Sequence, residues 1–207
     1  MGLRHQAGRA ARAIDALVFP ESKSADEQWM RQVMNDQISE RLAQLPRGTL
    51  SCLEISGTAH RDGWARYRSI SWPDYDICDP GLAVAPADVV IAEQVLEHVQ
   101  RPWIAMANLN RLCTPGGLVV VTTPFLVKRH REPNDYWRFT EDGLRVLIED
   151  AGLTVEHVQG WGNRWCVVGN LHRWSRRRPW QPTRNEESFP VVVWGFATPS
   201  SVTDPVA

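Results

Sequence analysis

The sequence predicts an α/β fold of one domain, built on a doubly wound, mostly parallel sheet. Two apolar runs, 89–92 (VVIA) and 118–121 (LVVV), are continuous rather than alternating, which is typical of strands buried on both faces of a parallel sheet. Between them, apolar residues recur at helical spacing over 103–112, and the turn-forming sequence Pro115-Gly116-Gly117 follows. Strand, helix and strand make one right-handed βαβ unit. Polar residues at the carboxyl ends of its strands are therefore expected to face a ligand crevice.

The other elements follow from the same two periodicities. Helices are expected at 26–45, capped by Ser24 or Asp26, and at 140–151, capped by Thr140 and ended by Gly152. Further strands are expected at 50–56, 64–70, 75–78 (a short edge segment), 153–158 and 190–197. The Trp- and Arg-rich stretch 161–185 is expected to be irregular and to cover one side of the fold.

Length and composition restrict the possible functions. The 207 residues suit a helical N-terminal segment, 1–45, followed by a domain over 46–207. A net charge of −1 gives no general attraction to nucleic acid. The two lysines, Lys23 and Lys128, belong neither to a phosphate-binding Gly-Lys-Ser/Thr loop nor to a Tyr-x-x-x-Lys pair.

Four scattered cysteines are expected to be reduced thiols of a cytosolic protein, with no metal site and no disulfide. No apolar run is long enough for a membrane span. Residues 1–19 are interpreted as an amphipathic helix, either packed on the domain or lying at a membrane surface.

The run 87–125 resembles the segment D-h-h-h…LEHh…LxPGGxhhhxTP of class I S-adenosylmethionine-dependent methyltransferases, where h is apolar. The resemblance extends over about 50–158, and more weakly to the C-terminus. It implies that S-adenosylmethionine lies across the carboxyl ends of the strands at 50–56, 64–70 and 89–92.

The first strand of that family usually ends in E/D-x-G-x-G, a tight turn that lets the backbone approach the cofactor. Here Glu54 stands at the acidic position, Ser56 and Thr58 replace the two glycines, and Gly57 lies between them. We expect a modified loop whose hydroxyls serve the cofactor carboxylate. The alternative is weakened cofactor binding.

The acid that usually binds the ribose hydroxyls is missing after the strand at 64–70. The resemblance makes Asp79 the candidate for the adenine amine, and Trp72 or Cys78 the candidates for packing against the ring. Asp74 and Asp76 are interpreted as turn residues.

Glu93 and Gln94 follow the strand at 89–92, which in related enzymes ends near the sulfonium and its methyl group. Glu97 and His98 are interpreted as residues that open the next helix.

Residues 124–140 resemble the PF…H…P-x-DYWR[FY]T signature of methyltransferases that modify sugars, polysaccharides and natural products. His130 is the candidate general base, with Asp135 or Glu132 orienting it, because an imidazole can take a proton near neutral pH. Alternatively, His130 and Asp135 only hold the loop by hydrogen bonds. Tyr136 and Arg138 are expected to line the acceptor pocket.

Trp161, Asn163 and Arg164 are expected to form a second wall of that pocket, suited to a carbohydrate or aromatic acceptor. The prediction is a methyltransferase acting on an oxygen or nitrogen of a small molecule, such as a sugar or secondary metabolite. Two alternatives stay open: a catalytically silent methyltransferase-like binding protein, and a nucleic-acid methyltransferase suggested only by the arginines at 176–178.

Overall fold

The computed structural model describes residues 15–200 and confirms the predicted α/β class. One six-stranded sheet has the order β2-β1-β3-β4-β6-β5. Its strands are β1 (Ser51–Ile55), β2 (Arg66–Ile70), β3 (Ala87–Glu93), β4 (Cys113–Pro124), β5 (Leu153–Trp161) and β6 (Val192–Pro199). The helices are α2 (Trp29–Ala43), α3 (Pro102–Leu112), α4 (Glu141–Asp150) and α5 (Arg164–His172), with short 3₁₀ turns η1 (Arg47–Thr49) and η2 (Leu96–His98).

The first four strands of the sheet, β2, β1, β3 and β4, are parallel, and β6 runs antiparallel between β4 and β5. Because β1, β2 and β3 point the same way, their carboxyl ends meet at one edge. The loops that follow these three strands are thereby brought together.

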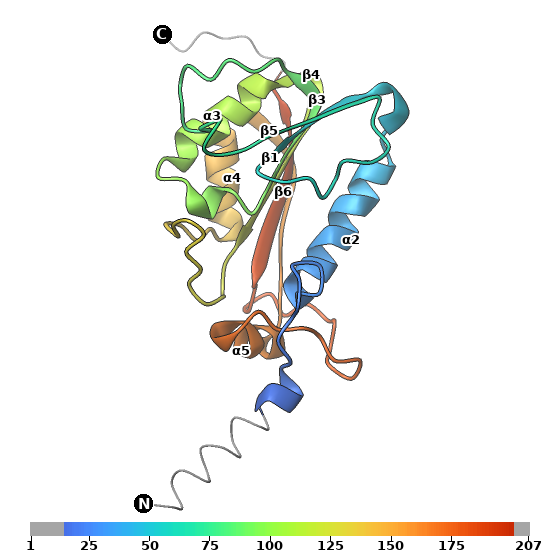
Figure 1. The fold of residues 1–207 in the computed structure, drawn as a ribbon, viewed down its shortest axis with the longest axis vertical. Coiled ribbons are helices and arrows are strands. Elements are labelled where there is room, and N and C mark those ends of the chain that lie inside the picture. Colours follow the sequence, from blue (N-terminus) through green and yellow to red (C-terminus); the bar gives the residue numbers. More distant parts are fainter. Residues whose placement is uncertain (1–14, 201–207) are drawn as a thin grey trace, which may run out of the picture.

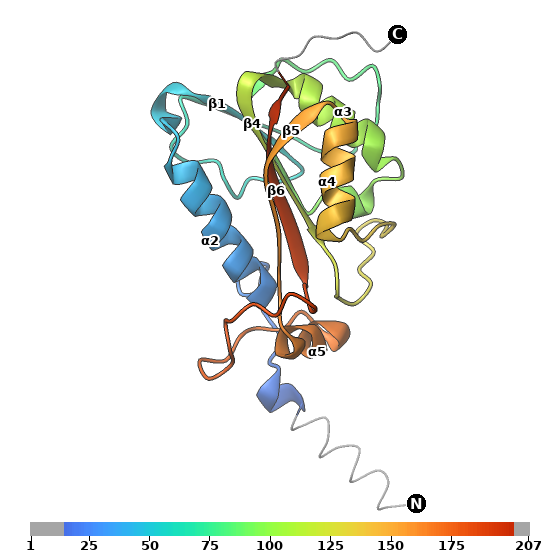
Figure 2. The ribbon, with the colours of Figure 1, turned by 180° about the vertical axis from the view of Figure 1, so that it is seen from behind.

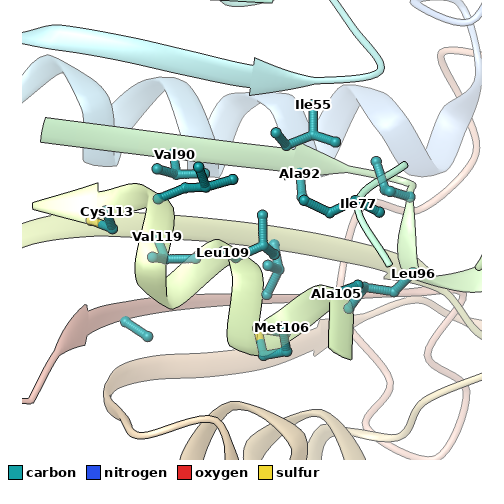
Figure 3. Close-up of a cluster of buried hydrophobic side chains, with 14 of the residues drawn as sticks. Ile55, Ile77, Val90, Ala92, Leu96, Ala105, Met106, Leu109, Cys113 and Val119 are labelled. Carbon is teal, nitrogen blue, oxygen red and sulfur yellow. The ribbon is translucent and has the colours of Figure 1, made fainter. Parts of the chain in front are cut away.

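Helices cover both faces of the sheet: α3 and α4 lie on one face and α2 lies on the other (Figures 1 and 2). Alternate residues of β3 supply both cores. Val90 and Ala92 pack with Leu109 of α3, as Figure 3 shows, whereas Val89 and Ile91 pack with α2. This two-sided burial explains why the strand sequences are continuously apolar.

The expected strand at 75–78 is wrong. The Asp76 carboxylate accepts a hydrogen bond from the backbone N–H of Cys78 at 2.8 Å, and Asp79 does the same for Gly81 at 2.8 Å. Such local side-chain bonds favour turns over strand pairing. Within residues 15–200, β2 is therefore the edge strand on this side of the sheet.

The expectation of an irregular 161–185 is also wrong in part, because α5 occupies residues 164–172. The Asn163 side chain starts this helix by accepting a hydrogen bond from the N–H of Cys166 at 2.9 Å. By contrast, α2 begins after Gln28 without a side-chain cap, so neither Ser24 nor Asp26 has the predicted role.

Two predicted helix boundaries are confirmed on α4. Thr140 Oγ1 accepts from the N–H of Gly143 at 3.1 Å, and Gly152 takes a φ of 80° just past the helix end. No helix among residues 15–200 combines the length and apolar character needed to cross a bilayer. Most of the predicted amphipathic segment 1–19 lies outside the described residues.

The core on the α3 side predicts a test of stability. Leu109 is fully buried between α3 and the sheet, so Leu109→Ala should lower the free energy of unfolding by about 2–5 kcal/mol. Leu171→Ala is the matched control, because Leu171 is half exposed and should change stability by about 0.5 kcal/mol. Urea denaturation measures both, and equal effects would contradict this assignment of the core.

Candidate active site

A cavity of about 870 Å³ opens at the carboxyl edge of β1, β2 and β3. Its lining includes Ile55 and Ser56 at the end of β1, Ile70 at the end of β2, and Gln94 just after β3. The remaining walls come from the start of α2, the segment 72–78, the turn η2 with its following residues, the loop 130–136, and Trp174. The cavity therefore lies where the sequence predicted the ligand crevice.

Two residues at this edge have left-handed backbones. Ser56 has a φ of 58° and Gln94 a φ of 54°, a region that costs a non-glycine residue about 1–2 kcal/mol. Both are held there: the N–H of Ser56 donates to Ile70 O at 2.7 Å, and that of Gln94 to Thr122 O at 3.1 Å. Serine thus makes the tight turn for which the family usually has glycine.

Glu54 organises the loop after β1 and does not line the cavity. Its carboxylate is buried and accepts hydrogen bonds from the N–H groups of Ala59 at 3.0 Å and His60 at 3.1 Å, and from the Tyr67 hydroxyl at 2.6 Å. Burial and this bond raise the pKa of Tyr67. A Cβ at Gly57 would lie 2.7 Å from Glu54 Oε1, so the glycine makes room for the carboxylate.

Glu93 ties three elements together behind the cavity. Its carboxylate forms an ion pair with Arg31 of α2, and His60 Nε2 approaches it at 2.8 Å. Burial acts to raise the pKa of Glu93, but the hydrogen bond from His60 and the charge of Arg31 outweigh it and leave the pKa lowered. Arg31 lines the cavity and Glu93 does not.

Of the residues predicted to surround the cofactor, some line the cavity and others lie outside it. Trp72 lines the cavity with its side chain exposed, and Cys78 also lines it. Asp79 lies outside, where it accepts from Gly81, while Asp76 stands in the wall. Thr58 is exposed and lies outside the lining.

The loop 128–138 is held by Asp135. This carboxylate accepts from the backbone N–H of His130 at 2.8 Å and pairs with the guanidinium of Arg138. Asp135 therefore positions the backbone of His130 and makes no hydrogen bond to its imidazole. Arg138 is placed behind the loop rather than in the cavity wall, whereas Tyr136 lines the cavity.

Two hydrogen bonds fasten the same loop to the η2 region. The N–H of Tyr136 donates to Glu97 O at 2.7 Å, and Trp137 Nε1 donates to Val99 O at 2.9 Å.

Trp161, Asn163 and Arg164 lie away from the cavity. Trp161 is buried against Trp29, Asn163 caps α5, and Arg164 pairs with Glu186 at 2.8 Å on the surface. The structure gives these three residues packing, capping and surface contacts, and none with the other predicted site residues.

The structure also gathers Glu97, His98 and His130, of which only His130 was a predicted site residue. Glu97 is fully buried, and burial raises the pKa of its carboxyl to about 8. Burial, together with the neighbouring His98, lowers the pKa of His130 to about 4. The imidazole rings of His98 and His130 are 4.8 Å apart and nearly perpendicular, and both line the cavity. The sequence signal for this group was the Leu-Glu-His run itself, which was interpreted as structural.

A family model described as a methyltransferase domain matches residues 14–158. The chain belongs to the class I methyltransferases. Its cofactor is S-adenosylmethionine. A comparison with curated proteins gave no match.

Three solved structures illustrate the shared fold. A chain from the complex between the Haloferax volcanii Trm112 methyltransferase activator and a methyltransferase has 13% identity and a TM-score of 0.55, with 93% of this chain and 97% of that chain covered. Magnesium protoporphyrin IX methyltransferase (ChlM) of Synechocystis PCC 6803, with bound SAH, has 12% identity and a TM-score of 0.54, with coverage of 89% and 92%. The N-methyltransferase NodS of Bradyrhizobium japonicum WM9 has 14% identity and a TM-score of 0.53, with coverage of 84% and 99%.

The cavity of this methyltransferase fits its cofactor. The volume falls within the range of about 300–1,000 Å³ typical of small-molecule sites. Ile55, Ile70 and Trp72 offer an apolar surface for a flat base, while Arg31 and Ser56 offer polar groups for the charged end.

The contacts of Glu54 predict that its charge is needed to form the loop. In Glu54→Gln, an amide N–H₂ would face donors from Ala59, His60 or Tyr67, which should lower the free energy of unfolding by about 1–3 kcal/mol. The same change should weaken binding of S-adenosylhomocysteine, because the loop carries Ser56. Glu40→Gln, at an exposed position of α2, is the control. Urea denaturation and calorimetric titration measure both effects, and equal behaviour of the two variants would contradict this role.

Proposed function

We propose that this methyltransferase transfers the methyl group of S-adenosylmethionine to an oxygen or nitrogen atom of a small-molecule acceptor. The observation that supports the proposal most is the cavity itself. It joins the residues expected at the cofactor, Ser56, Trp72 and Gln94, to the residues expected at the acceptor, His130 and Tyr136, in one continuous space.

At the cofactor end, we assign direct contact to the cavity residues and support to the residues behind them. Ser56 and Gln94 line the cavity from the left-handed turns after β1 and β3, and the amide nitrogen of Gln94 donates to Thr122 Oγ1 at 3.1 Å. Glu54 with Gly57 shapes the loop, and Glu93 fixes Arg31 at the wall. The bound cofactor supplies an electrophilic methyl group on a sulfonium, so positioning by these residues provides much of the rate.

At the acceptor end, the cavity offers aromatic side chains from two segments. Tyr136 is exposed on the loop 130–136, and Tyr75 is exposed on the segment 72–78. Aromatic rings present flat apolar surfaces with a polar atom at one edge. This lining supports a sugar or an aromatic secondary metabolite as the acceptor class.

The role of His130 as a general base remains part of the proposal, but Asp135 is now assigned to holding the loop and not to orienting the imidazole. A base works best with a pKa near the operating pH, and the pKa of His130 lies at about 4. Asp135 binds the backbone N–H of His130 and so holds the loop. The imidazole faces the cavity wall beside Glu97, with Nε2 of His130 3.8 Å from Glu97 Oε1.

Cofactor binding gives the decisive test of the proposal. Calorimetric titration should show binding of S-adenosylmethionine and S-adenosylhomocysteine with Kd values of about 1–100 μM, that is, about −5 to −8 kcal/mol. Trp72→Ala should weaken binding about tenfold or more by removing the exposed ring from the cavity wall. Trp180→Ala, an equally exposed tryptophan outside the lining, should leave binding unchanged.

No binding of either compound to the folded protein would overturn the proposal and favour a silent methyltransferase-like binding protein. Tight binding of RNA or DNA that weakens steeply with rising salt concentration would instead favour the nucleic-acid alternative.

An acceptor screen with sugars and phenolic metabolites then tests His130. If the imidazole removes the acceptor proton, His130→Ala should lower turnover about a hundredfold. Retention of the wild-type rate in a folded variant would exclude this role.

A further inference from the structure

Three potential metal ligands converge beside the cavity from two segments that are distant in the sequence. Glu97 and His98 come from η2, and His130 comes from the loop after β4. One ligand atom from each residue lies within 4.8 Å of the other two. His98 Nε2 is 3.6 Å from Glu97 Oε1, and His130 Nε2 is 3.8 Å from the same oxygen.

The carboxyl group of Glu97 has no hydrogen-bond partner among residues 15–200. Glu97 is 0% exposed, and neither Oε1 nor Oε2 is bonded. His130 Nε2 is also buried and unpartnered. Buried polar atoms are nearly always satisfied by a hydrogen bond or a bound ion. Three unpartnered atoms that face one another therefore indicate a missing common partner.

The orientation of His98 is the one that metal ligands adopt. Its Nδ1 is hydrogen-bonded to the backbone carbonyl of Asn134 and must carry the proton, because a carbonyl can only accept. Nε2 then has its lone pair free on the side of Glu97. Metal-binding histidines typically donate their second N–H to a carbonyl or carboxylate in this way.

We propose that Glu97, His98 and His130 bind a divalent first-row transition cation, through a carboxylate oxygen and the two Nε2 atoms. In a tetrahedral site, two ligand atoms that each lie about 2.1 Å from the metal ion are about 3.4 Å from each other. The two separations from Glu97 Oε1 are 3.6 and 3.8 Å and all three ligand atoms lie within 4.8 Å, so the side chains must close in around the ion.

Two imidazoles with one carboxylate suit Zn²⁺, Mn²⁺ or Fe²⁺ better than Mg²⁺, which prefers oxygen ligands and water. Three protein ligands also leave coordination positions open, as in catalytic rather than structural metal sites. Since His98 and His130 line the cavity, an acceptor oxygen or water can reach such a position. The Leu-Glu-His run alone does not indicate this site, because the third ligand, His130, lies 32 positions after His98 in the sequence.

The site is tested with Zn²⁺ and Mn²⁺ on the full chain, after removal of metal with a chelator. Equilibrium dialysis with elemental analysis should find about one ion per chain. Glu97→Gln, His98→Ala and His130→Ala should each weaken binding about a hundredfold. His172→Ala, which removes an exposed histidine at the end of α5, should bind as the wild type does.

Cobalt substitution gives a second readout that does not depend on activity. Co²⁺ should produce visible absorption bands in the wild type and none in Glu97→Gln. The ion should also raise the melting temperature of the wild type alone. Glu97→Gln is expected to fold, because it exchanges a buried unpaired carboxyl for an amide of the same size.

Absence of stoichiometric binding in the wild type would overturn the proposal, and so would binding that the three ligand variants leave unchanged. Binding of Mg²⁺ alone would exclude the stated class of ion. Because the readout is metal content, its failure is distinct from any failure to bind S-adenosylmethionine.

Discussion

The parallel pairing of β1 with β3 is the constraint on which the rest of the site depends. In this pairing, residues 52–54 of β1 align with residues 89–91 of β3, so both strands end at the same edge of the sheet. Each then turns through a left-handed residue, Ser56 or Gln94. The buried Glu93 receives Arg31 from α2 and His60 from the β1 loop, and a buried carboxylate that lost these partners would be strongly destabilising. One charge thus holds together the three elements that frame the cavity.

The sequence predicts the inner strands and the helices between them because burial on two faces leaves a clear signal. The runs at 89–92 and 118–121 lie within β3 and β4, although β4 begins at Cys113 and so includes the Pro115-Gly116-Gly117 that was predicted as a turn. Prediction fails where a few local hydrogen bonds decide the structure. Asp76 and Asp79 bend the segment 75–78 into turns. Asn163 starts α5 in a stretch whose tryptophans and arginines show no helical period.

The sequence was enough to predict which segments form the site, but less so to predict which of their side chains line the cavity. Ser56, Trp72, Gln94, His130 and Tyr136 line the cavity. Glu54, Glu93, Asp135 and Arg138 instead make the contacts that hold those segments in place. A motif in a sequence shows that a residue type belongs to a loop, but not whether its side chain faces the ligand or the core. Arg31 was missed because the face of α2 that meets the cavity is set by tertiary packing.

The hydrogen bonds from Tyr136 to Glu97 and from Trp137 to Val99 join the loop 128–138 to the η2 region. Asn134 adds a third attachment through His98. A segment attached at three points within the four residues 134–137 behaves as a fixed wall and not as a hinged lid. The loop therefore forms a wall of the cavity that is in place before any ligand binds, whereas Trp72 and Tyr75 line the cavity from the segment 72–78 with exposed side chains.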